Sequence, residues 1–97
     1  MLHMVVGIHG PDTCAAVVPV VKEMAKAGFG QMGETAKKYG ITALGSWSNM
    51  PAHVLYILVD APNAHVVSQW ARDTHLMDWN TVVVNPVVTL EEAMATL

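Results

Sequence analysis

Residues Leu2 to Ala16 read LHMVVGIHGPDTCAA, which is an alternating strand, a Gly-Pro break and the start of a helix. Four apolar residues alternate with other residues along the first half: Leu2, Met4, Val6 and Ile8. This period of two predicts a β-strand over residues 2–9, with its even-numbered side packed on helices. The odd-numbered side is more polar and is expected to face something else. His9 precedes the break and Cys14 follows it, and both residue types bind metals.

The length and composition of the chain predict one domain, residues 1–97, that associates with further copies of itself. Ninety-seven residues make a single domain with a modest core. Hydrophobic residues make up 53% of the chain and charged residues only 13%, whereas an average domain has about 25% charged residues. This excess of apolar residues predicts a homodimer or a higher homo-oligomer. We expect no membrane span, because no run approaches the ~20 apolar residues that cross a bilayer.

Charge and cysteine content indicate the partners and the compartment. The net charge is −3 with only five Lys and Arg residues, so no basic surface for nucleic acid is expected. The single Cys14 excludes an internal disulfide and fits a reducing compartment. The N-terminal stretch lacks the basic start of a signal peptide. These features predict a cytoplasmic protein.

The residues after the Gly-Pro break predict a helix with two irregularities. The helix is expected over 12–27, and Pro19 is expected to kink it by removing a backbone hydrogen bond. The glycines within 28–30 predict an interruption. A helix over 31–39 then ends at Gly40, which is a favourable C-terminal cap.

The remaining residues predict three strands and two helices. In chain order these are a strand over 41–48, a strand over 52–60, a helix opened by 60–63, a strand over 81–88 and a short helix over 89–96. Pro86 places the last strand at a sheet edge, because proline cannot donate to a hydrogen-bonded ladder. Thr89 and Glu92 form a capping box at the start of the short helix.

The element order is therefore β-α-β-β-α-β with a C-terminal helix, which is the ferredoxin-like pattern of an α+β domain. It predicts an antiparallel sheet with the strand order 4-1-3-2. One face of this sheet carries the helices, and the other face has no cover within the chain. Two such sheets meeting face to face would close a barrel-like dimer.

Three short stretches carry a family resemblance: HGPDTCAA near the start, HVLYILVDA in the middle and NPVVTLEEAM near the end. On these stretches and the element order, the chain resembles the dimeric α+β-barrel superfamily. That superfamily includes muconolactone isomerase-like proteins and cofactor-free small monooxygenases. More narrowly, the three stretches resemble those of a group of small bacterial and archaeal barrel proteins. The resemblance implies the fold and the dimeric barrel. It does not select a reaction, because the superfamily hosts several.

The predicted topology gathers candidate functional residues at one end of the domain. Those expected at the end where the first strand finishes are His9, Cys14, Asn49, His53, His75 and Trp79. Those expected toward the opposite end are His3, Asp60, His65 and Asn85. His3 is also expected on the uncovered face of the sheet.

His9, Cys14 and His53 form the most informative group. Two imidazoles and one thiolate suit zinc, copper or iron. Cys14 is expected in a first helical turn, where backbone N–H groups depress the pKa of a thiol. The competing interpretation is that Cys14 is a small buried hydrophobic residue and that the histidines hydrogen-bond locally.

The same end allows chemistry without a metal. His9 or His53 could act as a general base beside a pocket for a small organic molecule. Trp47, Asn49 and Tyr56 are the candidates for the walls and hydrogen bonds of that pocket. Asp60 is expected to cap its helix, and a second interpretation makes it a catalytic carboxylate in a barrel lumen.

Two functional hypotheses follow. The first is a small ligand- or metal-binding barrel protein, with isomerase, lyase or oxygenase chemistry as its enzymatic form. The second is a non-catalytic ligand-binding or assembly module that oligomerises through its apolar sheet face. A pure assembly module is expected to fill its inner barrel face with apolar residues: Val5, Leu55 and Ile57.

Overall fold

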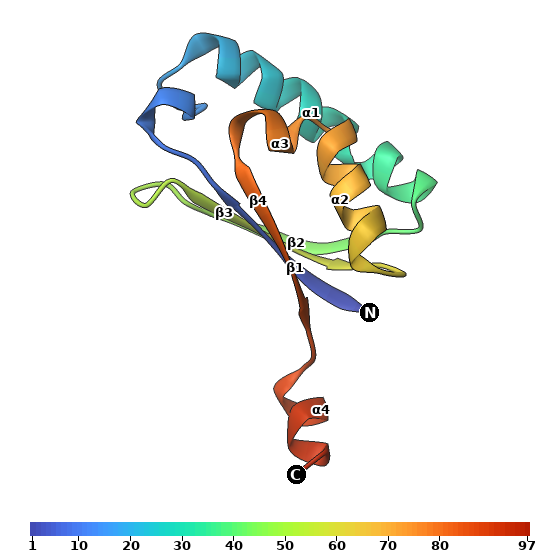
Figure 1. The fold of residues 1–97 in the computed structure, drawn as a ribbon. Coiled ribbons are helices and arrows are strands. Elements are labelled where there is room, and N and C mark those ends of the chain that lie inside the picture. Colours follow the sequence, from blue (N-terminus) through green and yellow to red (C-terminus); the bar gives the residue numbers. More distant parts are fainter.

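The computed structural model describes residues 1–97 as alternating strands and helices (Figure 1). The elements in chain order are β1 (Leu2–Ile8), a single 3₁₀ turn η1 (Pro11–Thr13), α1 (Pro19–Lys38), β2 (Thr42–Asn49), β3 (Val54–Asp60), α2 (Ala64–Asp73), α3 (Leu76–Trp79), β4 (Thr81–Val87) and α4 (Leu90–Ala95). None of these helices is both long and apolar enough to cross a lipid bilayer.

The four strands form one antiparallel sheet in the order β2-β3-β1-β4. This confirms the predicted strand order, and the α+β layout is consistent with a ferredoxin-like fold. Helices α1, α2 and α3 lie over the same face of the sheet (Figure 1). Strand β4 is at an edge of the sheet, as Pro86 predicted, because an edge strand tolerates a residue that has no N–H to donate.

The face of β1 beneath the helices is the odd-numbered one, so the predicted orientation of this strand is wrong. His3 and Val5 are completely buried there, whereas Ile8 on the other face is 46% exposed. The odd-numbered row includes Gly7, which packs closely on Leu55, because a Cβ added to Gly7 would lie 2.9 Å from Leu55 Cδ1. The helix-covered side of β1 therefore has room only for a residue without a side chain at this position. Both rows of β1 are largely apolar, and alternation alone therefore does not tell which row meets the helices.

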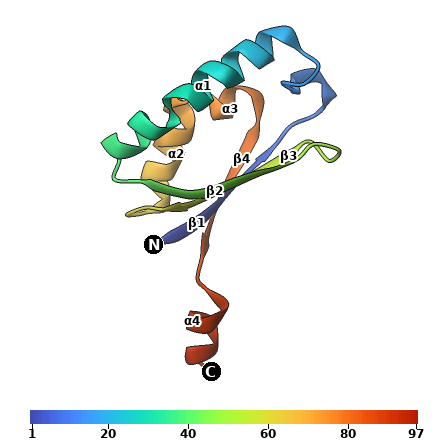
Figure 2. The ribbon, with the colours of Figure 1, turned by 180° about the vertical axis from the view of Figure 1, so that it is seen from behind.

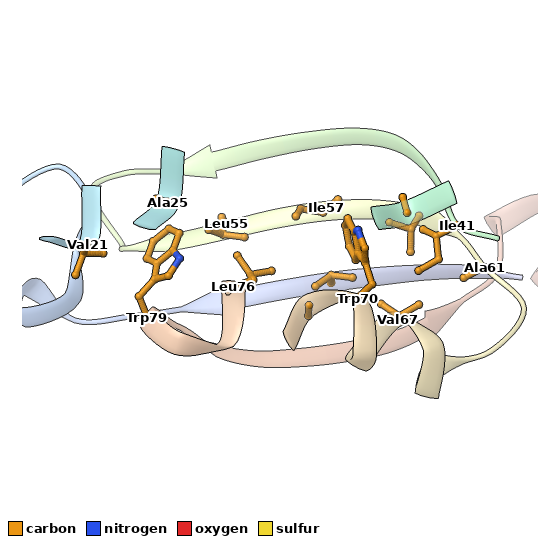
Figure 3. Close-up of a cluster of buried hydrophobic side chains, with 14 residues drawn as sticks. Val21, Ala25, Ile41, Leu55, Ile57, Ala61, Val67, Trp70, Leu76 and Trp79 are labelled. Carbon is orange, nitrogen blue, oxygen red and sulfur yellow. The ribbon is translucent and has the colours of Figure 1, made fainter. Parts of the chain in front are cut away.

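The strand register also shows that the residues expected to fill the inside of a dimeric barrel lie on the other face of the sheet. Val5 pairs with Ile57, and Gly7 pairs with Leu55, so these residues share the helix-covered face. Val5, Leu55 and Ile57 belong to the core of the chain itself. Figure 3 shows Leu55 and Ile57 facing Trp70, Leu76 and Trp79 from the helical layer.

Helix α1 is continuous, contrary to the two predicted irregularities. Pro19 occupies its first turn, where a missing N–H costs nothing and the fixed φ favours the helix. Gly28 is a site of close packing, because a Cβ there would lie 2.2 Å from the carbonyl oxygen of Thr74. Gly40 ends the helix with φ +68°, as predicted.

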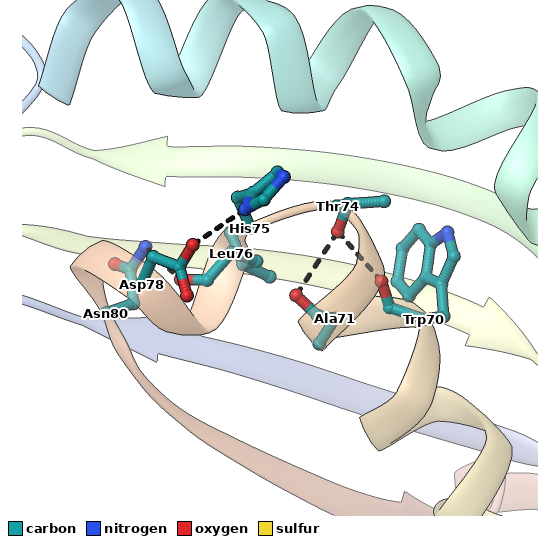
Figure 4. Close-up of polar contacts among 7 residues, drawn as sticks. All are labelled: Trp70, Ala71, Thr74, His75, Leu76, Asp78 and Asn80. Carbon is teal, nitrogen blue, oxygen red and sulfur yellow. Dashed lines mark hydrogen bonds and ion pairs between the residues drawn. The ribbon is translucent and has the colours of Figure 1, made fainter.

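The second helical region is divided at a left-handed residue. Thr74 Oγ1 donates to the carbonyl oxygens of Trp70 and Ala71, and His75 then takes φ +63° and starts α3 (Figure 4). Helix α2 is capped by Asn63, whose side chain accepts from Val66 N at 3.0 Å. The cap is therefore Asn63 and not the expected Asp60.

Helix α4 begins at the predicted capping residue, since Thr89 Oγ1 accepts from Glu92 N at 3.0 Å. Figures 1 and 2 show α4 hanging from the end of β4, on the side of the sheet opposite α1 and α2. Its apolar residues Leu90 and Met94 are exposed. The chain thus leaves both this helix and the open sheet face without a partner.

Candidate metal-binding site and cavity

His9, Cys14 and His53 come together as the topology predicted. One ligand atom from each of them lies within 4.8 Å of the others. His9 follows β1 and His53 precedes β3, and these strand ends are neighbours because Ile8 pairs with Val54. The His9 amide donates to the His53 carbonyl oxygen at 3.1 Å and extends that pairing by one step.

His53 has a strained backbone and an unused ring nitrogen. Its φ is +56°, a region that non-glycine residues seldom adopt and that is found at binding sites. The turn before it is closed by the His53 amide, which donates to the Met50 carbonyl oxygen at 3.1 Å. His53 Nδ1 is buried and has no hydrogen-bond partner. That nitrogen is therefore available to a ligand.

His9 is held by Asn80, which sequence reasoning did not single out. His9 Nδ1 lies 2.9 Å from Asn80 Oδ1, and Asn80 Nδ2 donates to the Leu76 carbonyl oxygen at 3.1 Å. The second bond fixes the amide orientation, so the oxygen faces His9 and Nδ1 must donate. In the neutral ring the lone pair then lies on Nε2, which leaves that atom free to bind a metal.

Cys14 is 8% exposed and follows the turn η1. It lies five residues before α1 begins, so its expected place in a first helical turn is wrong. The reason is that Pro19 starts the long helix, and the residues between form turns. The Cys14 sulfur is therefore not placed in the first turn of α1, and its role at the site rests on its position beside His9 and His53.

Aromatic rings surround the cluster. The His9 and His53 ring centroids are 5.4 Å apart in an edge-to-face arrangement, and His9 is 5.2 Å from Trp79. Phe29 meets Trp79 edge to face at 6.1 Å. Phe29 was not expected at the site. The sequence predicted an interruption of the helix over 28–30, and the direction of the Phe29 side chain could not be inferred for a residue in such an interruption.

The cluster forms one end of a cavity of about 860 Å³ between α1 and the strands β2 and β3. Most of its lining is hydrophobic, no carboxylate lines it, and Lys37 is its only Lys or Arg. Trp47 and Tyr56 also border it. They pair with each other and alternate along β2 and β3 with residues of the helix-covered face, so their side chains lie on the open face of the sheet and not among the walls under α1, where they were expected. Asn49 does not line it; instead its Oδ1 accepts from Ala52 N at 3.2 Å within the turn.

The other predicted candidates lie outside this cavity. Asp60 is at the far end of β3, where the N-terminal amine donates to it at 2.8 Å. This hydrogen bond and the amine charge lower the pKa of the Asp60 carboxyl. His75 is exposed, with Nδ1 2.7 Å from Asp78 Oδ2 (Figure 4).

His3 corrects another expectation. It lies at the predicted end of the domain but on the helix-covered face, where it is completely buried. Its Nδ1 is 3.2 Å from the Met1 carbonyl oxygen, and its Nε2 has no partner. Its burial follows from the odd-numbered orientation of β1.

Fold and site together define a small α+β protein with a histidine–cysteine cluster at the end of an apolar cavity. A family model matches residues 13–97, so the chain belongs to the family described as a domain of unknown function (DUF3303). The comparison with curated proteins found no match.

Proposed function

We propose that this protein binds one transition metal ion through His9, Cys14 and His53, and that zinc suits the site best. The observation that carries the proposal is the convergence of two imidazoles and a thiol, with ligand atoms within 4.8 Å. Zinc prefers this mixture of nitrogen and sulfur ligands, and copper and iron are the alternatives.

The geometry needs a small adjustment to reach coordination. With Zn–N near 2.1 Å and Zn–S near 2.3 Å, tetrahedral ligand atoms lie about 3.6 Å apart. A contraction of about 1 Å therefore brings the most distant pair into range, which side-chain rotation supplies. Asn80 supports the arrangement because it accepts a hydrogen bond from His9 Nδ1. Metal-binding histidines usually donate their second ring nitrogen to such an acceptor, which fixes the orientation of the ring.

Three protein ligands leave one coordination position open, which is the pattern of catalytic zinc sites. A metal there would act as a Lewis acid or lower the pKa of a bound water. Isomerase or lyase chemistry on a small organic molecule fits this arrangement. His9 and His53 serve as ligands in it, and Asp60 has no part because it lies outside the cavity.

The test is a competition titration with a chromophoric zinc chelator, using wild type, Cys14→Ser, His9→Ala and His53→Asn. We expect one zinc per chain in wild type. Loss of a ligand should weaken binding by more than about 100-fold, which exceeds the usual effect of removing a residue that only hydrogen-bonds to a ligand. Cobalt(II) substitution should add a thiolate charge-transfer band that Cys14→Ser abolishes.

His65→Ala is the matched control, because His65 is exposed on α2 and lies outside the cluster. It should bind zinc as wild type does. Wild type without stoichiometric zinc, or full binding in all three cluster variants, would refute the proposal.

A second candidate function is assembly, in which the open sheet face closes a dimeric barrel with a second copy. The register supports it, because β1 presents an apolar row there: Leu2, Met4, Val6 and Ile8. Neighbouring strands add Trp47, which is 57% exposed, and Val83. Light scattering of the purified chain tests this, with a dimer or larger assembly as the expected mass.

A further inference from the structure

We infer that the cavity beside the cluster binds an aromatic organic compound, neutral or anionic, with an oxygen or nitrogen donor facing His9, Cys14 and His53. The position of the donor atom rests on the proposed metal site. The class of compound rests on the shape, walls and charge of the cavity.

The cavity is elongated, with the cluster at one end. The lining residues of the edge strand β2 extend from Thr42 to Ser48, and at about 3.4 Å per residue the six steps between these two residues span about 20 Å. Ser48 lies at the cluster end, because the next residue of β2 pairs with Val54, which follows His53. Lys37 and Thr42 mark the opposite end. This length and the volume of about 860 Å³ suit an organic ligand of more than one ring.

The walls favour an apolar body. Helix α1 contributes Phe29, Met32 and Ala36, and β3 contributes Leu55 and Ile57. Transfer of an apolar ligand from water to such walls is favourable, whereas a charged body would lose its hydration without replacement.

The charges of the lining favour a neutral or anionic ligand over a cationic one. No Asp or Glu side chain borders the cavity, and Lys37 is at the end distant from the cluster. A divalent metal at the other end adds positive charge. The ligand is therefore neutral or anionic, with its donor atom at the metal.

The rings near the cluster favour an aromatic ligand. Phe29 and Trp79 meet edge to face, and Trp79 contacts the His9 ring. Phe29 is 47% exposed, so one face of this ring cluster is free. An aromatic ligand can extend the edge-to-face arrangement and gain more than its buried area alone supplies.

Two hydroxyl groups provide polar contacts along the wall. Ser46 and Ser48 pair with Ile57 and Leu55, so their side chains lie on the helix-covered face, and both border the cavity. Neither hydroxyl has a side-chain hydrogen-bond partner within the chain. They can donate to oxygen atoms of a hydroxylated or carboxylated ring.

The probe for this inference is 4-phenylimidazole, compared with imidazole, which has the same donor nitrogen and lacks the phenyl ring. Each is titrated by calorimetry into zinc-loaded and metal-free protein. We expect zinc-loaded protein to bind 4-phenylimidazole at least about tenfold tighter than imidazole, because the phenyl ring enters apolar walls. Equal affinities, or no binding of either probe to either form, would overturn the inference.

Two glycines of α1 offer a matched pair of blocking variants. A Cβ at Gly33 or at Gly30 meets no atom within 4 Å, so both positions accept a side chain, but only Gly33 lines the cavity. Gly33→Phe should abolish the preference for 4-phenylimidazole, and Gly30→Phe should keep it. Retention of the full preference in Gly33→Phe would place the phenyl ring elsewhere and reject the inference.

The zinc titration separates this inference from the proposed function. Zinc uptake without any preference for 4-phenylimidazole would sustain the metal site and overturn the aromatic ligand. Absence of zinc uptake, with 4-phenylimidazole still bound and blocked by Gly33→Phe, would refute the metal site and support the aromatic ligand.

Discussion

His53 combines two roles at the residue scale, because its backbone forms a left-handed turn and its ring points to the cluster. Asparagine tolerates the left-handed region, whereas alanine pays about 1 kcal/mol or more there. In metal-free protein we therefore expect His53→Asn to unfold at nearly the wild-type denaturant midpoint, and His53→Ala to lose about 1 kcal/mol of stability. Both should lose zinc. Equal stability of the two variants would show that the φ of +56° costs nothing.

Asn80 is a positioning residue, because it contacts His9 and not the expected metal. Asn80→Leu removes the acceptor for His9 Nδ1 and should weaken zinc binding by about 10- to 100-fold. Asn80→Asp keeps an acceptor for His9 Nδ1, so zinc affinity should be retained in that variant. The competition titration with the zinc chelator measures both affinities. Equal losses of zinc affinity in Asn80→Leu and Asn80→Asp, or no loss in Asn80→Leu, would contradict the positioning role.

At the scale of elements, α1 crosses the α2–α3 junction at Gly28. Replacing a helical glycine by alanine ordinarily stabilises by about 1 kcal/mol. At Gly28 the added Cβ would lie 2.2 Å from the Thr74 carbonyl oxygen, so Gly28→Ala should destabilise by about 1–3 kcal/mol. Gly30→Ala, with open space around it, should stabilise. Urea denaturation of both variants checks the difference in sign.

The C-terminal ends of α1 and α2 are joined by Tyr39, whose hydroxyl donates to the Asp73 carboxylate. This hydrogen bond, with burial and the Asp73 charge, raises the pKa of Tyr39 above its usual 10.0. A raised folded-state pKa gives stability that is present below pH 10 and is lost as the pH rises through the folded value. Thermal unfolding between pH 9 and pH 11 (a range of about one unit around the ordinary tyrosine pKa) should show a smaller loss in Tyr39→Phe than in wild type. Parallel curves would exclude this contribution.

At the scale of the whole molecule, one sheet face is covered by helices and the other is apolar and open. If a second copy covers that face, a charge at its centre must be buried without a partner. Val6 is central to it, since it pairs with Tyr56 and with Val83. Val6→Lys should therefore shift the mass from dimer to monomer in light scattering. Glu91→Lys on the exposed surface of α4 is the control for added charge. An unchanged assembly in Val6→Lys would reject the open face as the interface.

Local sequence signals were sufficient for much of the fold. Alternation placed β1, Pro86 indicated an edge strand, Gly40 ended α1 and Thr89 started α4, because each of these effects acts within a few residues. The split β-α-β order then placed the ends of β1 and β3 together, which brought His9 and His53 into one cluster. These inferences needed only chain connectivity and the antiparallel pairing of neighbouring strands.

Tertiary packing decided the features that local patterns leave open. The orientation of β1 depended on space beside Leu55, and the continuity of α1 depended on Gly28 fitting against Thr74. Asn80 reached His9 across 71 positions of the chain, a contact with no local signal. The sequence by itself therefore determined the order of strands and helical regions and which ligand residues meet. Only the tertiary structure decided which sheet face is covered and what lines the cavity, because both depend on shape complementarity between distant segments.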